Sequence, residues 1–302
     1  MFNKFLSGLV LLCFSTMVMA TEYRVMYPFG VGSSTDAIAR KIADVFNQNT
    51  GDVLVIENLP GANGLVGTEK WKNNKSLDIY VTSGTCQIFE PALKNDLPYN
   101  DNDFDYIIHI TTLVGVWVTR PDTGIKTPND LIKRMPAFVG SYSINWNQNV
   151  WVLAKEKNLK VQMVPYKGIN ETVQGLLAKD TDLIVVGNTA NIMGLVKAGK
   201  LHIVGTTYQE DYVQDGIKLL SVPKRTRLPG STGLFGLALR PGMDPTTAAY
   251  LKRELWRAIT SPEIKNFLES LGYIIDSTND PKQIVQHFSN ERARVKKYAV
   301  NQ

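Results

Sequence analysis

Cysteine and histidine are scarce in this chain of 302 residues, which contains two cysteines and three histidines. Cys13 lies in an N-terminal segment that we expect to be removed, so only Cys86 remains and no intramolecular disulfide is predicted. His109, His202 and His287 are far apart, and no pair has the spacing of metal ligands. Neither a G-x-S-x-G elbow nor a histidine base for Cys86 is visible. We therefore predict no metal, no cofactor and no enzymatic activity.

Long apolar runs are also missing. The N-terminus has only a short one. Lys4 precedes the apolar stretch Leu9–Phe14, and the ending Val18-Met19-Ala20 follows it. This arrangement is typical of a secretory signal peptide cleaved after Ala20, and its apolar part is shorter than the ~20 residues that span a bilayer. Lipidation of Cys13 is not expected, because Leu12 stands where a lipoprotein signal has a small residue. We predict an exported, soluble mature chain.

A strong charge of one sign is also absent. Lysine and arginine number 33 against 28 aspartates and glutamates, a net charge of +5 that is spread along the chain. Such a mild basic bias disfavours nucleic acid as a partner. The one basic cluster, Arg292, Arg294, Lys296 and Lys297, lies beside Glu291 in an expected terminal helix, where a solvated helix face explains it.

Short β-branched runs alternate with helical segments along the remaining chain, which is typical of an α/β fold with mostly parallel sheets. At this length a single core tends to divide, so we expect two domains. Xaa-Pro pairs place an N-cap before a first-turn proline at Thr127, Asp244, Ser261 and Asp280, and we assign Asn170 a capping role as well. The expected strands span residues 22–27, 53–56, 79–82, 106–110, 114–118, 138–140, 161–164, 183–186, 203–206 and 235–239.

Three short loops rich in glycine, serine and asparagine follow strands in the first part of the chain. They are Pro28–Asp36, Glu57–Gly64 and Ser83–Thr85. In an open parallel sheet such loops line the crevice at the carboxyl ends of the strands, where ligands bind. Glycine lets backbone N–H groups approach a ligand, and a helix N-terminus adds free donors and partial positive charge. Together the loops predict an oxyanion cradle, although each alone is also explained as a sterically required turn.

Nucleotide cofactors and covalent chemistry are disfavoured at these loops. No G-x-x-x-x-G-K-[ST] motif is present, and Gly30-Val31-Gly32 lacks the third glycine of the dinucleotide fingerprint. Lys167, which follows Tyr166, could form a Schiff base, but nothing in the sequence indicates that this lysine is desolvated. A hydrolase or lyase is the least favoured alternative.

The order and spacing of the loops resemble the extracytoplasmic solute receptors of tripartite tricarboxylate transporters, over nearly the whole mature length. Each match is short, but their joint specificity is high. The matching segments are Pro28-Phe29 through Gly32, Asp36, Ala39-Arg40, Glu57-Asn58, Pro60-Gly61-Ala62, Gly64, Pro91-Ala92-Leu93, Leu97-Pro98-Tyr99, Asp103-Phe104, Val164-Pro165-Tyr166-Lys167-Gly168, Asp182 and Lys197-Ala198-Gly199-Lys200.

The resemblance implies a two-lobed, type II Venus-flytrap fold, with each lobe a mostly parallel sheet flanked by helices. In that family a ligand carboxylate is held between loops by backbone N–H groups, hydroxyls and ordered waters. Asp182 is implied to brace a loop. The implied ligand contacts in this chain are Gly32, Ser33, Ser34, Thr35 and Asp36 in the first loop, Ala62, Asn63 and Gly64 in the second, Ser83 and Thr85 in the third, and Lys167 and Gly168 on the other lobe.

Departures from the family pattern bear on the ligand. Where the family has a small-residue stretch, this chain has Ser141–Asn147, so we add Asn145, Trp146 and Asn147 to the expected contacts. Trp146 has two interpretations: it stacks on a flat or aromatic solute, or it packs beside the hinge. Leu59, Asn63 and Leu65 also replace residues common in the family.

We expect residues 1–20 to be the signal peptide, residues 21–120 and 229–302 the first lobe, and residues 121–228 the second. The crossovers would lie in Arg120–Lys126 and Pro223–Gly233. As the resemblance implies, a periplasmic monomer would capture a small di-, tri- or aromatic carboxylate and present it to the membrane subunits of a tripartite tricarboxylate transporter. A receptor that presents the solute to a sensor kinase would have the same fold and pocket, so this alternative stays open.

Overall fold

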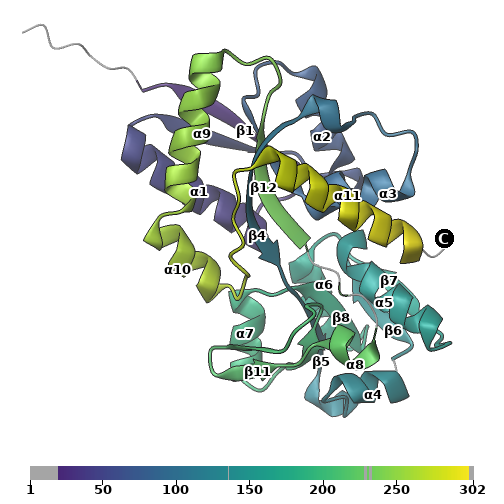
Figure 1. Ribbon diagram of the computed structural model, residues 1–302. Helices are drawn as coiled ribbons and strands as arrows, with labels where there is room; N and C mark the ends of the chain where they lie inside the picture. Colours follow the sequence, from purple (N-terminus) through teal and green to yellow (C-terminus); the bar gives the residue numbers. More distant parts are fainter. Residues whose placement is uncertain (1–19, 135, 228–229, 231–232, 299–302) are drawn as a thin grey trace, which may run out of the picture.

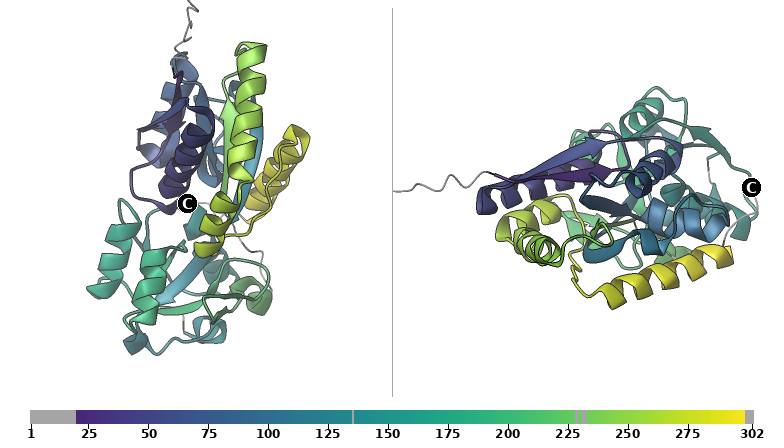
Figure 2. Two further views of the ribbon diagram at one scale, coloured as in Figure 1. Left: turned by 90° about the vertical axis from the view of Figure 1, so that its left-hand side faces the viewer. Right: turned by 90° about the horizontal axis from the view of Figure 1, so that it is seen from above.

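The computed structural model describes residues 20–134, 136–227, 230 and 233–298. The expected signal peptide, apart from Ala20, therefore lies outside the described residues. Two five-stranded sheets, each with helices on both faces, form the upper and lower lobes of Figure 1, and Figure 2 shows the lobes stacked end to end. The expected two-lobed α/β fold is confirmed. Within the described part of the chain, no helix is both long and apolar enough to cross a membrane.

The first sheet has the order β2-β1-β3-β12-β4. β12 runs antiparallel between β3 and β4, and the other four strands share one direction. The strands are β1 (Glu22–Tyr27), β2 (Val53–Asn58), β3 (Ile79–Ser83), β4 (Asp105–Leu113) and β12 (Gly233–Leu239). One face is covered by α1 (Ser34–Thr50), α9 (Pro245–Ile259) and α10 (Pro262–Ser270), and the other by α2 (Leu65–Asn73), α3 (Glu90–Leu93) and α11 (Pro281–Tyr298).

The second sheet repeats this arrangement in the order β7-β6-β8-β5-β9, again with one reversed strand, β5. Its strands are β5 (Gly115–Thr119), β6 (Phe138–Ser141), β7 (Gln162–Pro165), β8 (Leu183–Gly187) and β9 (His202–Thr206). The surrounding helices are α4 (Pro128–Lys133), α5 (Ile144–Glu156), α6 (Ile169–Leu177), α7 (Ala190–Lys197) and α8 (Val222–Thr226).

The chain first passes between the sheets at Val114, where β4 continues almost directly into β5. β5 pairs with β8 and β9, so residues 115–119 belong to the second sheet. The expected crossover at Arg120–Lys126 is therefore placed too late in the sequence. Two apolar strands meet at Val114 without a turn residue between them, so no local signal marks the passage. The return falls in Pro223–Gly233, which α8 enters and which includes residues 228–229 and 231–232, outside the described range.

The C-terminal segment after α10 returns to the first sheet beside this passage. Isolated antiparallel bridges join His109 to Thr278 and Thr112 to Ile274. Residues 274–278 thus run along β4 up to the point where it enters the second lobe.

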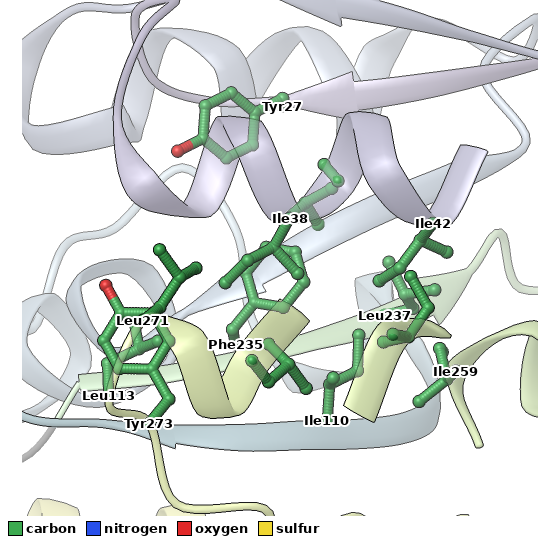
Figure 3. Packing of buried hydrophobic residues seen from close by; sticks show 14 of the residues in the cluster. Tyr27, Ile38, Ile42, Ile110, Leu113, Phe235, Leu237, Ile259, Leu271 and Tyr273 are labelled. Carbon is green, nitrogen blue, oxygen red and sulfur yellow. The ribbon is translucent and has the colours of Figure 1, made fainter. Parts of the chain in front are cut away.

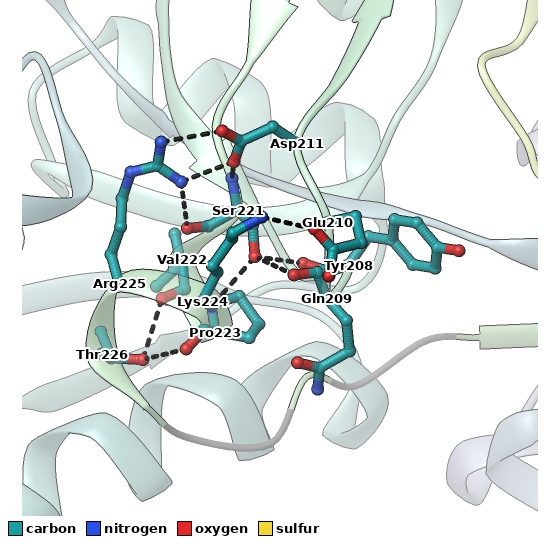
Figure 4. A network of polar contacts seen from close by, with 10 residues as sticks. All are labelled: Tyr208, Gln209, Glu210, Asp211, Ser221, Val222, Pro223, Lys224, Arg225 and Thr226. Atoms are coloured by element: carbon teal, nitrogen blue, oxygen red, sulfur yellow. Dashed lines mark hydrogen bonds and ion pairs between the residues drawn. The ribbon is translucent and has the colours of Figure 1, made fainter.

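A hairpin of the second lobe, β10 (Tyr212–Gln214) and β11 (Ile217–Leu219), was not expected from the sequence. Figure 4 shows how its flanks are tied to α8: Arg225 binds both carboxylate oxygens of Asp211, and the Ser221 hydroxyl donates to main-chain carbonyls of Tyr208 and Gln209. The strand that we expected at residues 203–206 is therefore followed by a hairpin that is hydrogen-bonded to α8 of the same lobe.

One continuous apolar cluster passes through both lobes. The cluster includes Ile38 and Ile42 of α1 and Phe235 of the first sheet. It extends to Trp117 and Val185 of the second sheet. Figure 3 shows its first-lobe part, where Leu113 and Tyr273 lie together at one end. The two sheets consequently share a core in addition to having packed faces of their own.

Most expected helix starts agree with the structure. Thr127, Asp244 and Ser261 each accept a hydrogen bond from a first-turn N–H, as N-caps do. Asn170 is not a cap, because α6 begins one residue earlier, at Ile169, with Gly168 as its N-cap. The N-cap Gly168 has an extended backbone and no side chain. Asn170 therefore lies inside the first turn of α6 and does not cap it.

Candidate functional site

Loops at the carboxyl ends of the parallel strands in the two lobes meet each other. A side-chain carbon built on Gly187, the last residue of β8, would lie 4.0 Å from Oγ of Ser34, at the start of α1. A carbon built on Gly84, after β3, would lie 3.2 Å from Oδ1 of Asn145. The structure thus brings the first and third expected loops against the second lobe, at the sheet edge where open α/β sheets bind ligands.

The first loop is organised by hydroxyl groups around the N-terminus of α1. Ser33 is the N-cap and its Oγ accepts the N–H of Asp36 at 3.1 Å. The Tyr27 hydroxyl at the end of β1 lies 2.7 Å from Ser33 Oγ and 2.5 Å from Thr35 Oγ1. Ser34 is the first helical residue, so its N–H has no carbonyl partner within the helix. This end of α1 offers donors and partial positive charge to an anion.

Asp36 holds the first loop together. Its carboxylate accepts the N–H of Gly32 at 3.0 Å and the side-chain amide of Asn58 at 2.9 Å, and Arg40 binds both its oxygens. Burial would raise the pKa of Asp36, but these hydrogen bonds outweigh it and hold the pKa below its ordinary value. Asp36 is 2% exposed and its carboxylate is fully engaged, so its expected contact with a solute stays a prediction.

The second loop has a strained backbone. Gly61, Ala62, Asn63 and Gly64 all have positive φ, with values of 142°, 45°, 57° and 89°. Ala62 and Asn63 are exposed, and the Asn63 amide donates to Glu90 at 3.2 Å. Gly64 is buried, and a side-chain carbon there would lie 2.7 Å from Sγ of Cys86. Backbone strain of this kind concentrates at functional sites.

The third loop is shorter than expected. β3 leads directly into a π-helical turn at Thr85–Phe89, a feature that often marks functional positions. Ser83 Oγ accepts the N–H of Cys86 at 3.2 Å, and Thr85 is buried. Cys86 packs under Gly64, and burial raises the pKa of its thiol, which keeps it protonated. Ser83 and Thr85 thus lie beside the second loop, with their neighbour Gly84 facing Asn145.

On the second lobe, Trp146 is only 5% exposed. Carbons built on Gly115 and Gly187 would lie 2.6 Å and 3.5 Å from its ring, and its Nε1 donates to the Tyr142 hydroxyl at 3.0 Å. This position fits the packing interpretation. Asn147 is hydrogen-bonded to Ser141, at the end of β6.

Lys167 and Gly168 lie at the end of β7, on the same sheet edge as Ser141 and Gly187. The Lys167 N–H donates to Glu171 at 3.1 Å, and the Gly168 carbonyl accepts from Thr172 at 3.1 Å, so both engage the first turn of α6. The Lys167 side chain is exposed. Asp182 pairs with Arg120 at 2.7 Å, in the bracing role that we expected.

One residue at this junction, Tyr273, was missed from the sequence. Tyr273, after α10, lies with its hydroxyl 2.6 Å from Ser34 Oγ and 2.9 Å from the carbonyl of Asn188, after β8. It therefore touches both lobes. No local pattern indicates this, because Ser34 and Tyr273 are 239 positions apart.

Two histidines that we treated as unrelated are neighbours on the outer side of the first lobe. The rings of His109 and His287 lie 5.6 Å apart, and His109 Nε2 is 3.0 Å from Asp276. They line a cavity of about 200 Å³ beside α11. Among the described residues, no group of three or more histidine, cysteine, aspartate or glutamate side chains is placed to hold a metal ion.

The groups that meet between the lobes are hydroxyls, amides, main-chain N–H groups and aromatic rings. The carboxylate of Asp36 is neutralised by Arg40 behind the loop, so it does not repel an anion there. Such a set suits recognition of an anionic solute by hydrogen bonds and dipoles. It contains no nucleophile paired with a base.

Comparison with known proteins places the fold in a family. The model of the family described as "Tripartite tricarboxylate transporter family receptor" matches residues 38–301. A UPF0065 protein from the tcbD-tcbE intergenic region of Pseudomonas sp. (strain P51) is 24% identical over 284 residues, which cover 90% of this chain and 84% of the relative.

Solved structures show the same fold. An R. palustris protein determined with adipate superposes with a TM-score of 0.81 at 18% identity, covering 92% of this chain and 96% of the other. MatC from Rhodopseudomonas palustris with bound malate gives a TM-score of 0.77 at 18% identity, covering 93% and 99%. At these identities the structures establish the shared fold.

Proposed function

Because this chain belongs to the tripartite tricarboxylate transporter receptors, we propose that it binds a small carboxylated solute between its lobes and delivers it to the membrane subunits of such a transporter. The proposal includes export to the periplasm through the N-terminal segment and action there as a monomer. We divide the chain at Val114, with residues 115–227 as the second lobe.

The observation that carries the proposal is the N-terminus of α1, which meets the second lobe through Ser34. A 17-residue helix ends there in N–H groups that its own carbonyls do not satisfy. An anion at that point gains hydrogen bonds and the helix dipole without a buried counter-charge. The adipate and malate of the two similar structures are carboxylates, which agrees with this ligand class.

Thermal unfolding of the mature protein against a solute panel tests the ligand class. The panel contains citrate, malate, adipate, amino acids and aromatic acids, with neutral sugars as controls. A bound solute at 100 times its dissociation constant stabilises the fold by about 2.7 kcal/mol, which is readily detected. Stabilisation confined to carboxylates is expected, while a response to sugars alone would contradict the proposal.

Two variants of one residue test the place of the carboxylate. Ser34→Ala removes only the hydroxyl, whereas Ser34→Pro also removes the N–H and is tolerated at the first helical position. Loss of a hydrogen bond to a charged group costs about 1.5–3 kcal/mol, so we expect Ser34→Pro to bind about 10- to 100-fold more weakly than Ser34→Ala. Equal affinities of the two folded variants would show that the helix N-terminus does not hold the solute.

A further inference from the structure

Gly187, the last residue of β8, is overlain by atoms from both lobes. A side-chain carbon built on it would lie 3.5 Å from Cζ2 of Trp146, 3.9 Å from the Tyr142 hydroxyl oxygen and 4.0 Å from Ser34 Oγ. All three are ordinary contact distances, so there is room for one carbon atom at this point. Trp146 and Tyr142 belong to the second lobe and Ser34 to the first. This space between the lobes is thus bounded by an aromatic ring and two hydroxyl groups.

The Tyr142 hydroxyl is held in place as a hydrogen-bond acceptor. Nε1 of Trp146 donates to its oxygen at 3.0 Å, and the main-chain N–H of Gly187 also hydrogen-bonds to it. The Trp146 ring is fixed in turn by close packing against Gly115, where a side-chain carbon would lie 2.6 Å from it. Burial raises the pKa of Tyr142, so the hydroxyl keeps its proton at neutral pH. Tyr142 therefore retains one proton to donate while its oxygen accepts two hydrogen bonds.

The Ser34 hydroxyl has a similar arrangement. Tyr273 donates its hydroxyl proton to Ser34 Oγ at 2.6 Å and to the carbonyl of Asn188 at 2.9 Å. Ser34 Oγ is an acceptor in this contact, so its own proton is not used there. Among the residues that the structure describes, neither the Ser34 nor the Tyr142 hydroxyl proton has an acceptor. Two donors from opposite lobes consequently lie within 4.0 Å of the same point over Gly187.

We propose that Tyr142 and Gly187 form the second-lobe half of the carboxylate site. The Ser34 and Tyr142 hydroxyls donate to the two oxygens of one carboxylate, which lies over Gly187 and against the edge of the Trp146 ring. This inference rests on the proposed function and adds the residues that face the start of α1 from the other lobe. A carboxylate suits this place because it only accepts, while both hydroxyl groups have a proton to donate. Since the donors belong to different lobes, a solute bound in this way holds the lobes together.

Gly187→Ala tests the place of the carboxylate without removing a polar group. Its methyl group would fill the space at 3.5 Å or more from its neighbours, and no positive φ opposes alanine there, so the variant should fold. Isothermal titration uses malate, adipate and citrate as probes. We expect each probe that binds the wild type to bind Gly187→Ala about 10- to 100-fold more weakly, because the methyl group and the solute compete for one space.

Gly194→Ala is the matched control for this variant. Gly194 lies in α7 of the same lobe, and a carbon built there meets nothing within 4 Å. Its affinity for the same probes should equal that of the wild type.

Tyr142→Phe tests the hydroxyl donor and keeps the ring. Loss of a hydrogen bond to a charged group lowers affinity about 10- to 100-fold, and we expect this decrease with the same probes. Tyr250→Phe is the control, since its hydroxyl contacts Asp52 at 2.6 Å within the first lobe, and it should bind as the wild type does. Circular dichroism and thermal unfolding without solute verify that each variant is folded.

The outcomes separate this inference from the proposed function. If the wild type binds no carboxylate, the proposed function is rejected. If the wild type binds a carboxylate and either folded variant, Gly187→Ala or Tyr142→Phe, binds it equally well, the solute does not lie over Gly187 and the inference is wrong. If one of the two variants does not fold, the other decides alone.

Discussion

Gly64 shows at the level of one residue why the second loop tolerates little change. Its φ of 89° lies in the left-handed region, and a side-chain carbon would meet Cys86 Sγ at 2.7 Å and the Phe29 ring at 3.1 Å. Both the conformation and the space therefore require glycine. Phe29 belongs to the first loop and Cys86 directly follows the third, so Gly64 lies where the second loop contacts the first loop and the turn after the third.

We expect Gly64→Ala to lower the free energy of unfolding by about 1–3 kcal/mol, since overpacking adds to backbone strain. Gly30→Ala in the first loop is the control, because a carbon built there meets nothing within 4 Å. Urea denaturation followed by circular dichroism measures both. A Gly64→Ala variant as stable as Gly30→Ala would mean that the loops are less tightly joined than the structure shows.

The sequence predicted the positions of the three loops better than it predicted the contacts that each side chain makes. Glycine, serine and strand-to-helix spacing are local signals, and Ser33, Ser34 and Gly64 lie where they led us to expect. The contacts of Asp36 could not be predicted, because a carboxylate in such a loop looks the same in the sequence whether it faces outward or binds Arg40 and Asn58 behind the loop. Tyr273 carried no signal, because its contacts are set by the packing of the whole chain.

Among the elements, α11 is sensitive to pH through His287. Burial lowers the pKa of His287, and the neighbouring His109 lowers it further, while Glu291 and Asp276 oppose the change and Arg294 adds to it. In the folded protein this imidazole stays neutral at a pH where the unfolded chain already takes up a proton. The contribution of this pKa difference to the free energy of unfolding is full at pH values above about 6.5. It decreases as the pH falls below that value.

The free energy of unfolding should therefore fall between pH 7.5 and pH 5, and His287→Gln should remove part of that fall. Gln286→Ala, an exposed change in the same helix, should keep the wild-type dependence. Urea titrations at several pH values provide the measurement. Parallel curves for the wild type and His287→Gln would show that His287 does not contribute.

The boundaries of helices and strands could be predicted from the sequence where a turn or a capping residue marks them. They could not be predicted where one strand runs directly into the next. The prolines at positions 128, 245 and 262 mark real helix starts. The passage at Val114 was missed because β4 runs almost directly into β5, and only strand pairing assigns β5 to the other sheet. The β10–β11 hairpin was missed because its three-residue strands are too short to show a period.

At the scale of the molecule, the apolar cluster that runs through both lobes predicts that they unfold together. Residues of both sheets, such as Phe235 and Trp117, belong to that one cluster. Hydrogen exchange should give the slowest amides of the two sheets the same free energy of opening. Gly64→Ala, although it changes only the first lobe, should lower that value in both. A decrease confined to the first sheet would mean that the lobes unfold separately.

The place of β12 also has a consequence for the order in which the chain can fold during its synthesis. β12 fills the gap between β3 and β4, yet it ends at Leu239, long after both of those strands have emerged. Until then the first sheet lacks an interior strand, and β4 has no permanent neighbour within it. The first lobe, although its strands are the earliest to emerge, therefore cannot finish folding before β12 has been synthesised.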